Sequence, residues 1–373
     1  MPSFHPPCRL LLGPGPSDVP QRILDALARP TIGHLDPAFV GMMDALKDLL
    51  RQTFQTSNPL TIPVSAPGSA GMEACFVNLI EPGDTVIVCR NGVFGGRMRE
   101  NVLRVGAHAV MVDDDFGKPV APEKVEAALH ANPGAKAVAF VHAETSTGAR
   151  SDAATLCRLA HEHGALSIVD AVTSLGGIEL DVDGWGIDAI YSGSQKCLSA
   201  PPGLSPLSFS ARATDAVKAR RTPVQSWFLD TSLVMAYWDG SGGRSYHHTA
   251  PVNMLYALHE SLTMLHEEGL QAAWARHRAN HERLRDGLQR LDLALLVDEQ
   301  YRLPQLNAVV VPDGVDEAGV RRALLEKHGI EIGAGLGPLA GKIWRIGLMG
   351  ASSRPEAVDR VLDALSDVLG RSA

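Results

Sequence analysis

The feature that most constrains the fold is an alternation of short apolar runs with helical patterns between about residue 60 and residue 210. The apolar runs predict strands over 85–88, 109–113, 137–142, 166–170, 188–192 and 207–210. Helical patterns lie between them, near 71–80, 122–131 and 151–163. Continuous apolar strands separated by helices are typical of a sheet that is covered on both faces. We therefore predict an α/β fold with a parallel or mostly parallel sheet.

A different pattern begins near residue 251. Large side chains recur every three or four residues, as on one face of a long helix: Leu270, Trp274, His277, His281, Leu284, Leu288 and Leu291. We interpret this stripe as core packing of a connecting helix. A strand at 307–312, a helix at 317–328, short strands near 331 and 343–348, and a helix at 354–369 follow. The 373 residues therefore divide into a large domain, 21–255, and a smaller α+β domain, 256–373.

Composition excludes several classes of protein. The chain is 45% apolar and 20% charged, which is ordinary for a compact globular protein. Its net charge of −8 argues against a nucleic-acid partner. The five cysteines are odd in number and form no CxxC pair, which favours reduced thiols over disulfides or a zinc site.

The sequence also gives no sign of a membrane or a secretory destination. It contains no apolar run of about 18 residues that could span a bilayer. The first residues, MPSFHPPCRLLLGPGP, lack the basic start and long apolar core of a signal peptide. We therefore predict a cytoplasmic protein.

Three familiar motifs can be set aside. The run GLGPLAGK at 335–342 resembles a phosphate loop, but Leu336 stands where that loop needs its first glycine, and Ile343 where it needs Ser or Thr. His161 and His163 are two residues apart, so on a helix they point in different directions. The chain has no HExxH segment. We predict no metal site.

The candidate chemistry lies at the carboxyl ends of two expected strands, where open α/β sheets bind ligands. The strand at 166–170 ends in Asp170, and the next strand leads through Ser192-Gly193-Ser194-Gln195 to Lys196. Either residue alone has a structural explanation, as a helix cap or a solvent-exposed amine. Together they match what pyridoxal phosphate needs, a lysine for the Schiff base and a carboxylate that keeps the pyridine nitrogen protonated.

Several segments then resemble class V aminotransferases of fold type I, and among them the alanine–glyoxylate and serine–glyoxylate (serine–pyruvate) aminotransferases. These segments are SGSQKCLSAPPGLS, VDAVTSLGG, HAETSTG, YHHTAPVNMLYALHESL and RIGLMG. The resemblance runs from LLGPGPSDVP to the last helix, nearly the whole chain. It implies a large domain with a seven-stranded type of sheet, and a substrate arm at 1–20.

The resemblance assigns roles to individual residues. Lys196 would be the Schiff-base lysine and, once released, the base that moves the substrate Cα proton. Asp170 would pair with the pyridinium nitrogen. Ser146 would hydrogen-bond the 3-oxygen of the cofactor, although Thr145 or Thr147 could share that role.

The same resemblance implies the remaining contacts of the cofactor. Phe94 stands where many relatives carry a Trp that stacks on the ring. Gly68 and Ser69 would bind the phosphate at a helix start, where free amides favour an anion, and Gln195 would add a side-chain donor. Pro67 departs from the pattern of many relatives and removes one backbone donor.

The resemblance also implies a dimer and a substrate clamp. Tyr246 and Thr249 would reach the phosphate of the neighbouring subunit of a homodimer. Arg345 would bind the substrate carboxylate, because a guanidinium group matches a carboxylate through two hydrogen bonds. Backbone around Gly15 would close over the substrate.

We therefore predict a ping-pong transaminase that moves an amino group from alanine or serine to glyoxylate or pyruvate. One carboxylate clamp suits small monocarboxylates, unless Arg97, Arg99 or Arg244 approaches the site. The alternatives within the family are (S)-ureidoglycine–glyoxylate, 2-aminoethylphosphonate–pyruvate and pyridoxamine–pyruvate transaminases. A cysteine-desulfurase-like lyase and a non-enzymatic regulator that binds pyridoxal phosphate are the alternatives outside it.

Overall fold

The computed structural model describes residues 2–239 and 244–371 of the chain. Its large domain is built on a seven-stranded sheet in the order β2-β10-β9-β8-β5-β3-β4. The strands are β2 (Leu60–Val64), β10 (Ser205–Phe209), β9 (Ala189–Tyr191), β8 (Leu166–Asp170), β5 (Ala137–Val141), β3 (Thr85–Arg90) and β4 (His108–Asp113). β10 runs antiparallel to both of its neighbours, and all the other pairs are parallel. The predicted mostly parallel α/β sheet is confirmed.

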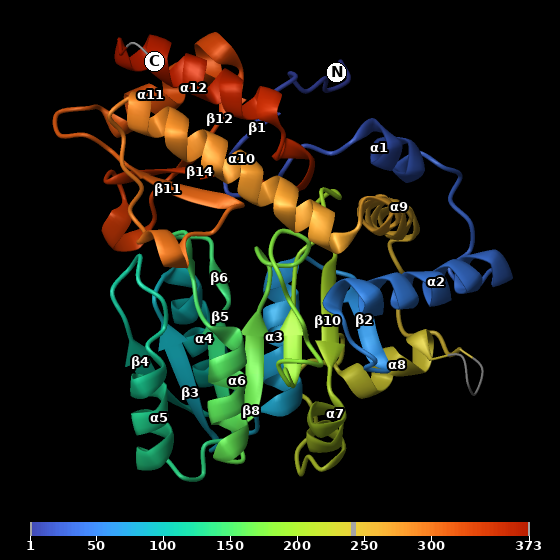
Figure 1. The fold of residues 1–373 in the computed structure, drawn as a ribbon. Helices are drawn as coiled ribbons and strands as arrows, with labels where there is room; N and C mark the ends of the chain where they lie inside the picture. Colours follow the sequence, from blue (N-terminus) through green and yellow to red (C-terminus); the bar gives the residue numbers. More distant parts are fainter. Residues whose placement is uncertain (1, 240–243, 372–373) are drawn as a thin grey trace.

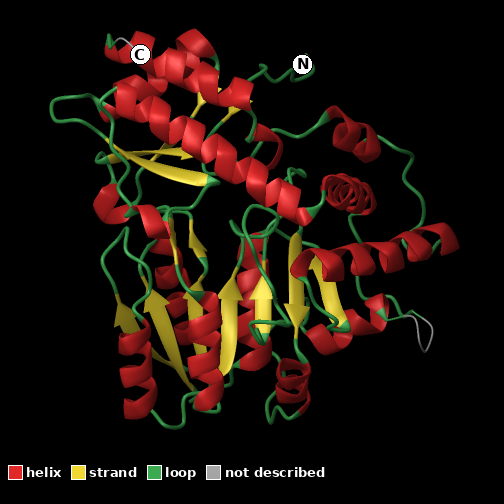
Figure 2. Ribbon diagram, in the orientation of Figure 1, coloured by secondary structure: helices red, strands yellow, loops and turns green. Residues whose placement is uncertain are grey.

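Helices cover both faces of this sheet, as the continuous burial of its central strands requires. On one face lie α3 (Gly68–Leu79) and α4 (Val93–Arg104), which contact each other, and α7 (Ala211–Lys218), which contacts α3. On the other lie α5 (Pro122–Ala131) and α6 (Ala153–Glu162), in front in Figure 1. Most strand arrows in Figure 2 point toward the small domain, so the carboxyl edge of the sheet faces it.

Several elements of the large domain were not predicted, among them β2 and α4. β2 contains Pro63, which lacks a backbone donor, and the strand is tolerated because it lies at the edge of the sheet and pairs only with β10. α4 contains Gly95 and Gly96 and begins after Gly92 with no cap from a neighbouring side chain. A helix with these features has little local signal in the sequence.

The small domain lies over the carboxyl edge of the large sheet (Figure 1). An antiparallel sheet of β11 (Leu306–Val310), β14 (Ile343–Gly347) and β13 (Gly333–Ala334) packs against α10 (Leu270–Arg290), α11 (Glu317–His328) and α12 (Pro355–Leu369). α10 connects the two domains: Ala273 belongs to the core of the large domain, and Leu284 and Leu288 to the core of the small one. The helix predicted from the stripe is therefore present, with His277 and His281 buried on its inner face.

The N-terminal segment is held by the small domain. β1 (Leu10–Leu11) pairs in parallel with β12 (Ile330–Glu331), and Leu10 and Leu12 are buried in the small-domain core. The amide of Gly347 donates to the carbonyl of Leu12 at 2.8 Å. These contacts direct the next residues of the chain toward the gap between the domains.

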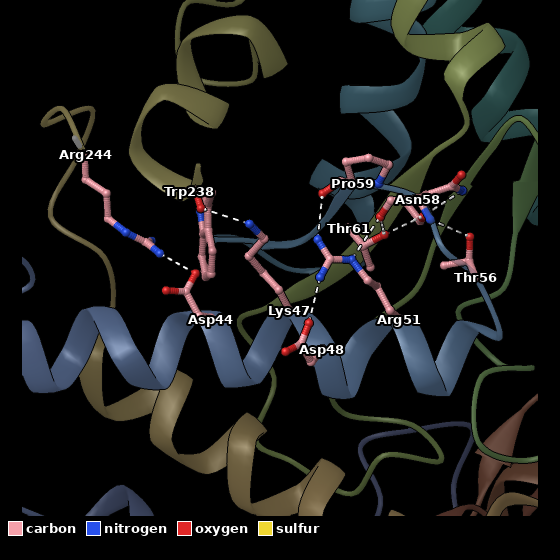
Figure 3. Close-up of polar contacts among 11 residues, drawn as sticks. Asp44, Lys47, Asp48, Arg51, Thr56, Asn58, Pro59, Thr61, Trp238 and Arg244 are labelled. Atoms are coloured by element: carbon pink, nitrogen blue, oxygen red, sulfur yellow. Dashed lines mark hydrogen bonds and ion pairs between the residues drawn. The ribbon is translucent and has the colours of Figure 1, made fainter. Parts of the chain in front are cut away.

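Polar contacts attach α2 (Pro37–Phe54) to the edge of the large sheet and to α8 (Thr231–Trp238) (Figure 3). Arg51 donates to the carbonyls of Asn58 and Pro59, just before β2. Lys47 donates to the carbonyl of Trp238 at 3.1 Å, and Arg244 forms an ion pair with Asp44. The helices α1 (Gln21–Leu27) and α9 (Val252–Glu268) pack on this side, with α9 in contact with both α1 and α2.

The remaining elements are short. They are the hairpin strands β6 (Ala143–Glu144) and β7 (Ala149–Arg150) and the 3-10 turns η1 (Glu299–Tyr301), η2 (Gly337–Leu339) and η3 (Gly350–Ser352). The run that resembles a phosphate loop is the connection between β13 and β14, with η2 in its middle. Among the described residues, no helix has both the length and the apolar character that crossing a bilayer requires.

Candidate active site

Asp170 and Tyr191 end two adjacent parallel strands and contact each other. β8 and β9 pair with Asp170 opposite Tyr191, so both side chains reach the same edge of the sheet. Asp170 Oδ2 accepts a hydrogen bond from the Tyr191 hydroxyl at 2.7 Å, and Oδ1 accepts one from the Val172 amide at 2.8 Å. Burial raises the pKa of Asp170 to about 6, against the lowering effect of these two hydrogen bonds. The carboxyl group is thus fixed at the bottom of the site, away from water.

Lys196 lies near enough to this carboxyl group to interact with its charge, on the segment that follows β9. The side chain is only 9% exposed, and its Nζ donates a hydrogen bond to the carbonyl of Pro14. Burial lowers the pKa of Lys196 to about 8; Arg345 acts in the same direction, and Asp170 opposes it. About a tenth of this amine is therefore neutral, and nucleophilic, at pH 7, far more than for a lysine with its ordinary pKa.

The N-terminal segment crosses directly over Lys196. Gly15 has a φ of +96°, and a Cβ atom there would lie 2.7 Å from Lys196 Nζ. Only glycine accepts both this backbone conformation and this approach. The Ser17 hydroxyl then donates to the backbone carbonyl of Lys196 at 2.8 Å. Gly15 and Lys196, predicted for one site, therefore lie in contact.

Arg345 reaches the same region from the small domain. Its Nε donates to the carbonyl of Ala334 at 2.7 Å, and its Nη1 to the carbonyl of Thr145 at 3.2 Å. Nη2 makes no hydrogen bond to any residue that the structure describes. Burial lowers the pKa of Arg345 to about 10, while Glu144 raises it. A guanidinium group remains charged at that pKa, so the site contains a buried cation with an uncommitted donor.

The three other arginines considered as second cations have separate positions. Arg99 is exposed and pairs with Glu100, and Arg244 pairs with Asp44 on α2. Arg97 lies over the ring of Phe94, with its Cζ 4.7 Å from the ring centre. Of the three, Arg97 alone acts on the site, because its charge lowers the pKa values of both Asp170 and Lys196. For Lys196 this effect adds to the larger lowering by burial. For Asp170 it opposes burial, which raises the pKa.

Ser146 lies in the turn of the β6–β7 hairpin, beneath the first residues of α4. Its Oγ accepts a hydrogen bond from the Val93 amide at 2.9 Å and donates one to Glu144 Oε1 at 2.6 Å. Phe94, the next residue of α4, is partly buried against the core. Of the neighbours that could share the role of Ser146, Thr145 bonds through its hydroxyl to Thr173, and Thr147 accepts from the Ala149 amide at 3.4 Å.

The start of α3 provides free backbone donors. α3 begins at Gly68 without a side-chain cap, and the amides of Gly68 and Ser69 find no acceptor among the described residues. A Cβ atom on Gly68 would lie 3.3 Å from the carbonyl oxygen of Ser192, on the segment that leads to Lys196. Gln195 on that segment has a buried Oε1 without a partner. Such a helix start is well suited to an anion.

Tyr246 and Thr249 stand apart from this group in the single chain. The Tyr246 side chain is 63% exposed, its hydroxyl lies 3.4 Å from that of Thr249, and its ring centre lies 5.4 Å from that of His34. None of these contacts involves a residue around Lys196. Tyr246 and Thr249 are therefore the two predicted residues that this chain alone does not bring to the site.

Two residues of the site were not predicted from the sequence. Tyr191 could have been predicted from the sequence. It ends the strand that follows the strand ending in Asp170, and parallel neighbours bring such end residues together. Glu144 had a weaker signal, an acidic residue within the apolar and small residues of HAETSTG. Its hydrogen bonds are to Ser146, two residues along the chain. Its neighbours Gly92 and Arg345 are far from it in sequence, and only the tertiary structure reveals them.

The chain resembles known proteins over nearly its whole length. The family model described as aminotransferase class-V matches residues 10–352. The chain is 41% identical to an alanine–glyoxylate aminotransferase of Callithrix jacchus, over 97% of this chain and 88% of that protein. It is 38% identical to an (S)-ureidoglycine–glyoxylate transaminase of Bacillus subtilis, over 98% of this chain and 91% of the relative.

A solved structure agrees with these relatives in fold. The crystal structure of an alanine–glyoxylate aminotransferase from Nostoc sp. superposes with a TM-score of 0.97 at 47% identity. The superposition covers 99% of this chain and 97% of that one. Both domains, the N-terminal segment and the gap between the domains therefore have counterparts in the solved structure.

Proposed function

Because the chain belongs to the class-V aminotransferases, enzymes that depend on pyridoxal phosphate, we propose that it transfers the amino group of alanine or serine to glyoxylate, or to pyruvate. The reaction is ping-pong: the donor leaves as a 2-oxo acid before the acceptor is aminated. The observation that carries this proposal is the grouping of Lys196, Asp170 and Arg345 in one buried site. Membership of the family was predicted from the sequence and is confirmed.

The residues of the site fit pyridoxal phosphate. The unpaired amides of Gly68 and Ser69 suit its phosphate group. Gln195 lies on the adjoining segment, and its Nε2 would be the donor to the phosphate, because its Oε1 can only accept. Asp170 places a buried carboxyl group where a protonated ring nitrogen would compensate the cost of its burial. Lys196 would hold the cofactor at rest. Once the substrate amine has replaced the Lys196 amine, the cofactor would withdraw electrons from the bonds at the substrate α-carbon, and the lysine would be free.

Within this site each protein group has a separate task. Ionised Asp170 holds a proton on the ring nitrogen. Lys196 Nζ, once free and with its lowered pKa, would accept a proton from the substrate α-carbon and pass it to the cofactor. Arg345 holds the substrate carboxylate and so orients the α-carbon toward Lys196. Phe94 covers one side of the site, and Ser146 lies beside it as a polar contact.

The choice of substrate rests on Arg345 and on the relatives. A small amino acid offers little for recognition except its carboxylate, and one buried guanidinium group satisfies it. Arg99 and Arg244 are paired elsewhere. Arg97, whose charge does act on the site, lies over the Phe94 ring, and we expect it to stay there rather than bind a second carboxylate. The alanine–glyoxylate and ureidoglycine–glyoxylate relatives share glyoxylate in their names, which supports it as acceptor. (S)-Ureidoglycine is therefore the alternative donor.

The proposal includes a homodimer. Tyr246 is exposed beside Thr249, and on the same part of the chain Trp227 is 62% exposed with its ring stacked on His247. Exposed aromatic side chains of this kind support a protein interface, and a second subunit would bring Tyr246 and Thr249 to the phosphate end of its partner's site. We also propose a cytoplasmic location, supported by the free state of the five cysteines.

A panel of substrates tests the proposed reaction. We expect alanine and serine to donate efficiently to glyoxylate or pyruvate, and we expect poor activity with 2-oxoglutarate, which needs a second cation for its distal carboxylate. Steady-state rates for each donor with the three acceptors, with (S)-ureidoglycine included as a donor, provide the measurement. Preference for ureidoglycine would select the alternative donor, and preference for 2-oxoglutarate would contradict the single-clamp argument.

Attachment of the cofactor to Lys196 tests the site itself. We expect the purified protein to absorb visible light with pyridoxal phosphate, and borohydride to fix the pyridoxyl group on the peptide that contains Lys196. Because the neutral amine reacts, the rate of attachment should rise with pH through a midpoint near the pKa of about 8. Mass spectrometry of the labelled peptides and stopped-flow absorbance provide the measurements.

Lys47 is a matched control for this experiment. It is as buried as Lys196, its pKa is also lowered by burial, and it donates to a backbone carbonyl (Figure 3). Lys47→Arg should keep the label, and Lys196→Arg should lose it. Label that persists in Lys196→Arg would refute the assignment of this lysine.

A further inference from the structure

Glu144 lies within the site, yet the proposed reaction gives it no task. It ends β6 and is fully buried. Its Oε1 accepts hydrogen bonds from the amide of Ser146 at 3.0 Å and from the hydroxyl of Ser146 at 2.6 Å. Its Oε2 is buried and forms no hydrogen bond of ordinary geometry, although the Phe94 amide lies near enough to lower the pKa of the carboxyl group. A buried carboxyl group with one such oxygen is costly, so a role for it should be sought.

Glu144 also packs against the first residues of α4. A Cβ atom on Gly92 would lie 2.2 Å from Glu144 Cδ, so the carboxyl group occupies the space beside that glycine. Gly92 provides no side-chain cap for α4. Instead, the Val93 amide donates to Ser146 Oγ at 2.9 Å, and this hydroxyl is held in turn by Glu144. The start of α4, with Phe94 as its second residue, is therefore capped from outside the helix.

The charges around Glu144 come from three strands. Burial raises the pKa of Glu144 to about 7, against the lowering effects of its Ser146 hydrogen bonds and of the Phe94 backbone amide; Asp170 on β8 raises it. Arg345 on β14 faces it as the opposite charge, and Tyr191 on β9 senses its charge as well. Glu144 therefore interacts electrostatically both with Arg345, the proposed substrate-binding cation, and with the buried carboxyl group of Asp170.

We propose that Glu144 is a positioning residue: its carboxyl group caps α4 through Ser146, and its proton decides which partner the Ser146 hydroxyl donates to. This inference rests on the proposed function, in which Phe94 and Ser146 border the cofactor.

The Ser146 hydroxyl can donate only one hydrogen bond at a time. It has one hydrogen, and its oxygen already accepts from Val93. An ionised Glu144 has only acceptors, so it takes that hydrogen. A neutral Glu144 can instead donate to Ser146 Oγ, which frees the hydroxyl hydrogen for the 3-oxygen of the cofactor. Glu144 thus couples the protonation of the site to the contact expected of Ser146.

Hydrogen exchange on the full-length chain, before the cofactor is added, tests the capping. We expect Glu144→Ala to accelerate exchange of the Val93 and Phe94 amides by about fivefold or more, the loss typical of a helix cap. Ser146→Ala should reproduce the effect at Val93. Glu144→Gln should restore the wild-type rate, because an amide oxygen can still accept from Ser146. The Thr155 amide, capped locally by Asp152 on α6, is the internal control.

The pH midpoint of the visible absorbance of bound pyridoxal phosphate tests whether the Glu144 proton controls the hydrogen bond of the Ser146 hydroxyl. We expect Glu144→Gln to shift this midpoint by about one pH unit, since a titrating carboxyl group beside Ser146 becomes neutral at all pH values. Glu100→Gln, on the exposed surface of α4, should leave it in place. A merely structural Glu144 would move the exchange rates without moving this midpoint.

The outcomes separate the two proposals. Unchanged exchange in both Glu144→Ala and Ser146→Ala, or an unchanged midpoint in Glu144→Gln, would overturn the role of Glu144. If Glu144→Ala does not fold, Ser146→Ala and the midpoint of Glu144→Gln still decide. Failure of the wild-type chain to bind pyridoxal phosphate would instead overturn the proposed function, with the exchange result for α4 unaffected.

Discussion

Arg345→Lys and Arg345→Ala should each lower kcat/KM by about 10²-fold or more in both half-reactions, while the visible absorbance of the bound cofactor stays normal. The substrate presents little besides its carboxylate, and a lysine cannot form the two parallel hydrogen bonds of a guanidinium group. Without that pair the α-carbon loses its orientation toward Lys196, so both kcat and KM should change. Single-turnover absorbance with alanine, and then with glyoxylate, measures each half-reaction separately.

Arg345 also has a structural role that the experiment must separate. Its donors bridge the carbonyls of Ala334 and Thr145, which join the small domain to the β6–β7 turn. Thermal melting of each variant shows whether the fold survives. Arg283→Lys, which alters an exposed pair with Asp359 in the same domain, is the matched control and should keep wild-type kinetics. Unchanged kinetics in Arg345→Lys would place the carboxylate site elsewhere; loss of the fold or of the cofactor would make Arg345 structural.

Asp170→Asn should lower kcat by about 10²-fold or more with little change in the fold. Asparagine keeps the size of the side chain and can still accept from the Tyr191 hydroxyl, but it carries no charge to hold a proton on the ring nitrogen. Without that proton the ring withdraws electrons less strongly, and removal of the α-proton becomes slow. Single-turnover kinetics of the donor half-reaction, with wild-type protein alongside, provide the measurement.

Asp188 offers a control for the burial of a carboxylate alone. It is as buried as Asp170 but precedes β9, at the opposite edge of the sheet, where it pairs with Arg212 and accepts from the Ser167 amide. Asp188→Asn should reduce stability and leave kcat of the folded protein near the wild-type value. Turnover of Asp170→Asn close to wild type would show that the ring nitrogen has a different partner.

Much of the large domain can be read from the sequence, because its signals are local. The strand ending in Asp170 and the helix at 122–131 were predicted with the bounds that the structure has. Apolar continuity and helical spacing report burial residue by residue, whatever the chain does elsewhere. α4 escaped prediction for the same reason: its two glycines weaken the local signal, and its cap comes from Ser146 in another segment.

The sequence by itself determined the family, the mostly parallel sheet and the residue types that pyridoxal phosphate requires, since these depend on short motifs and strand ends. Only the tertiary structure decided how those residues meet. The Lys196 amine donates a hydrogen bond to the carbonyl of Pro14, which is 182 positions away in the sequence. The Arg345 guanidinium group donates one to the carbonyl of Thr145, at a separation of 200 positions. The tertiary structure also places the Glu144 carboxyl group against Gly92. Such contacts depend on the order of the strands and on how the two domains close over their edge, and no local pattern of side chains encodes that order.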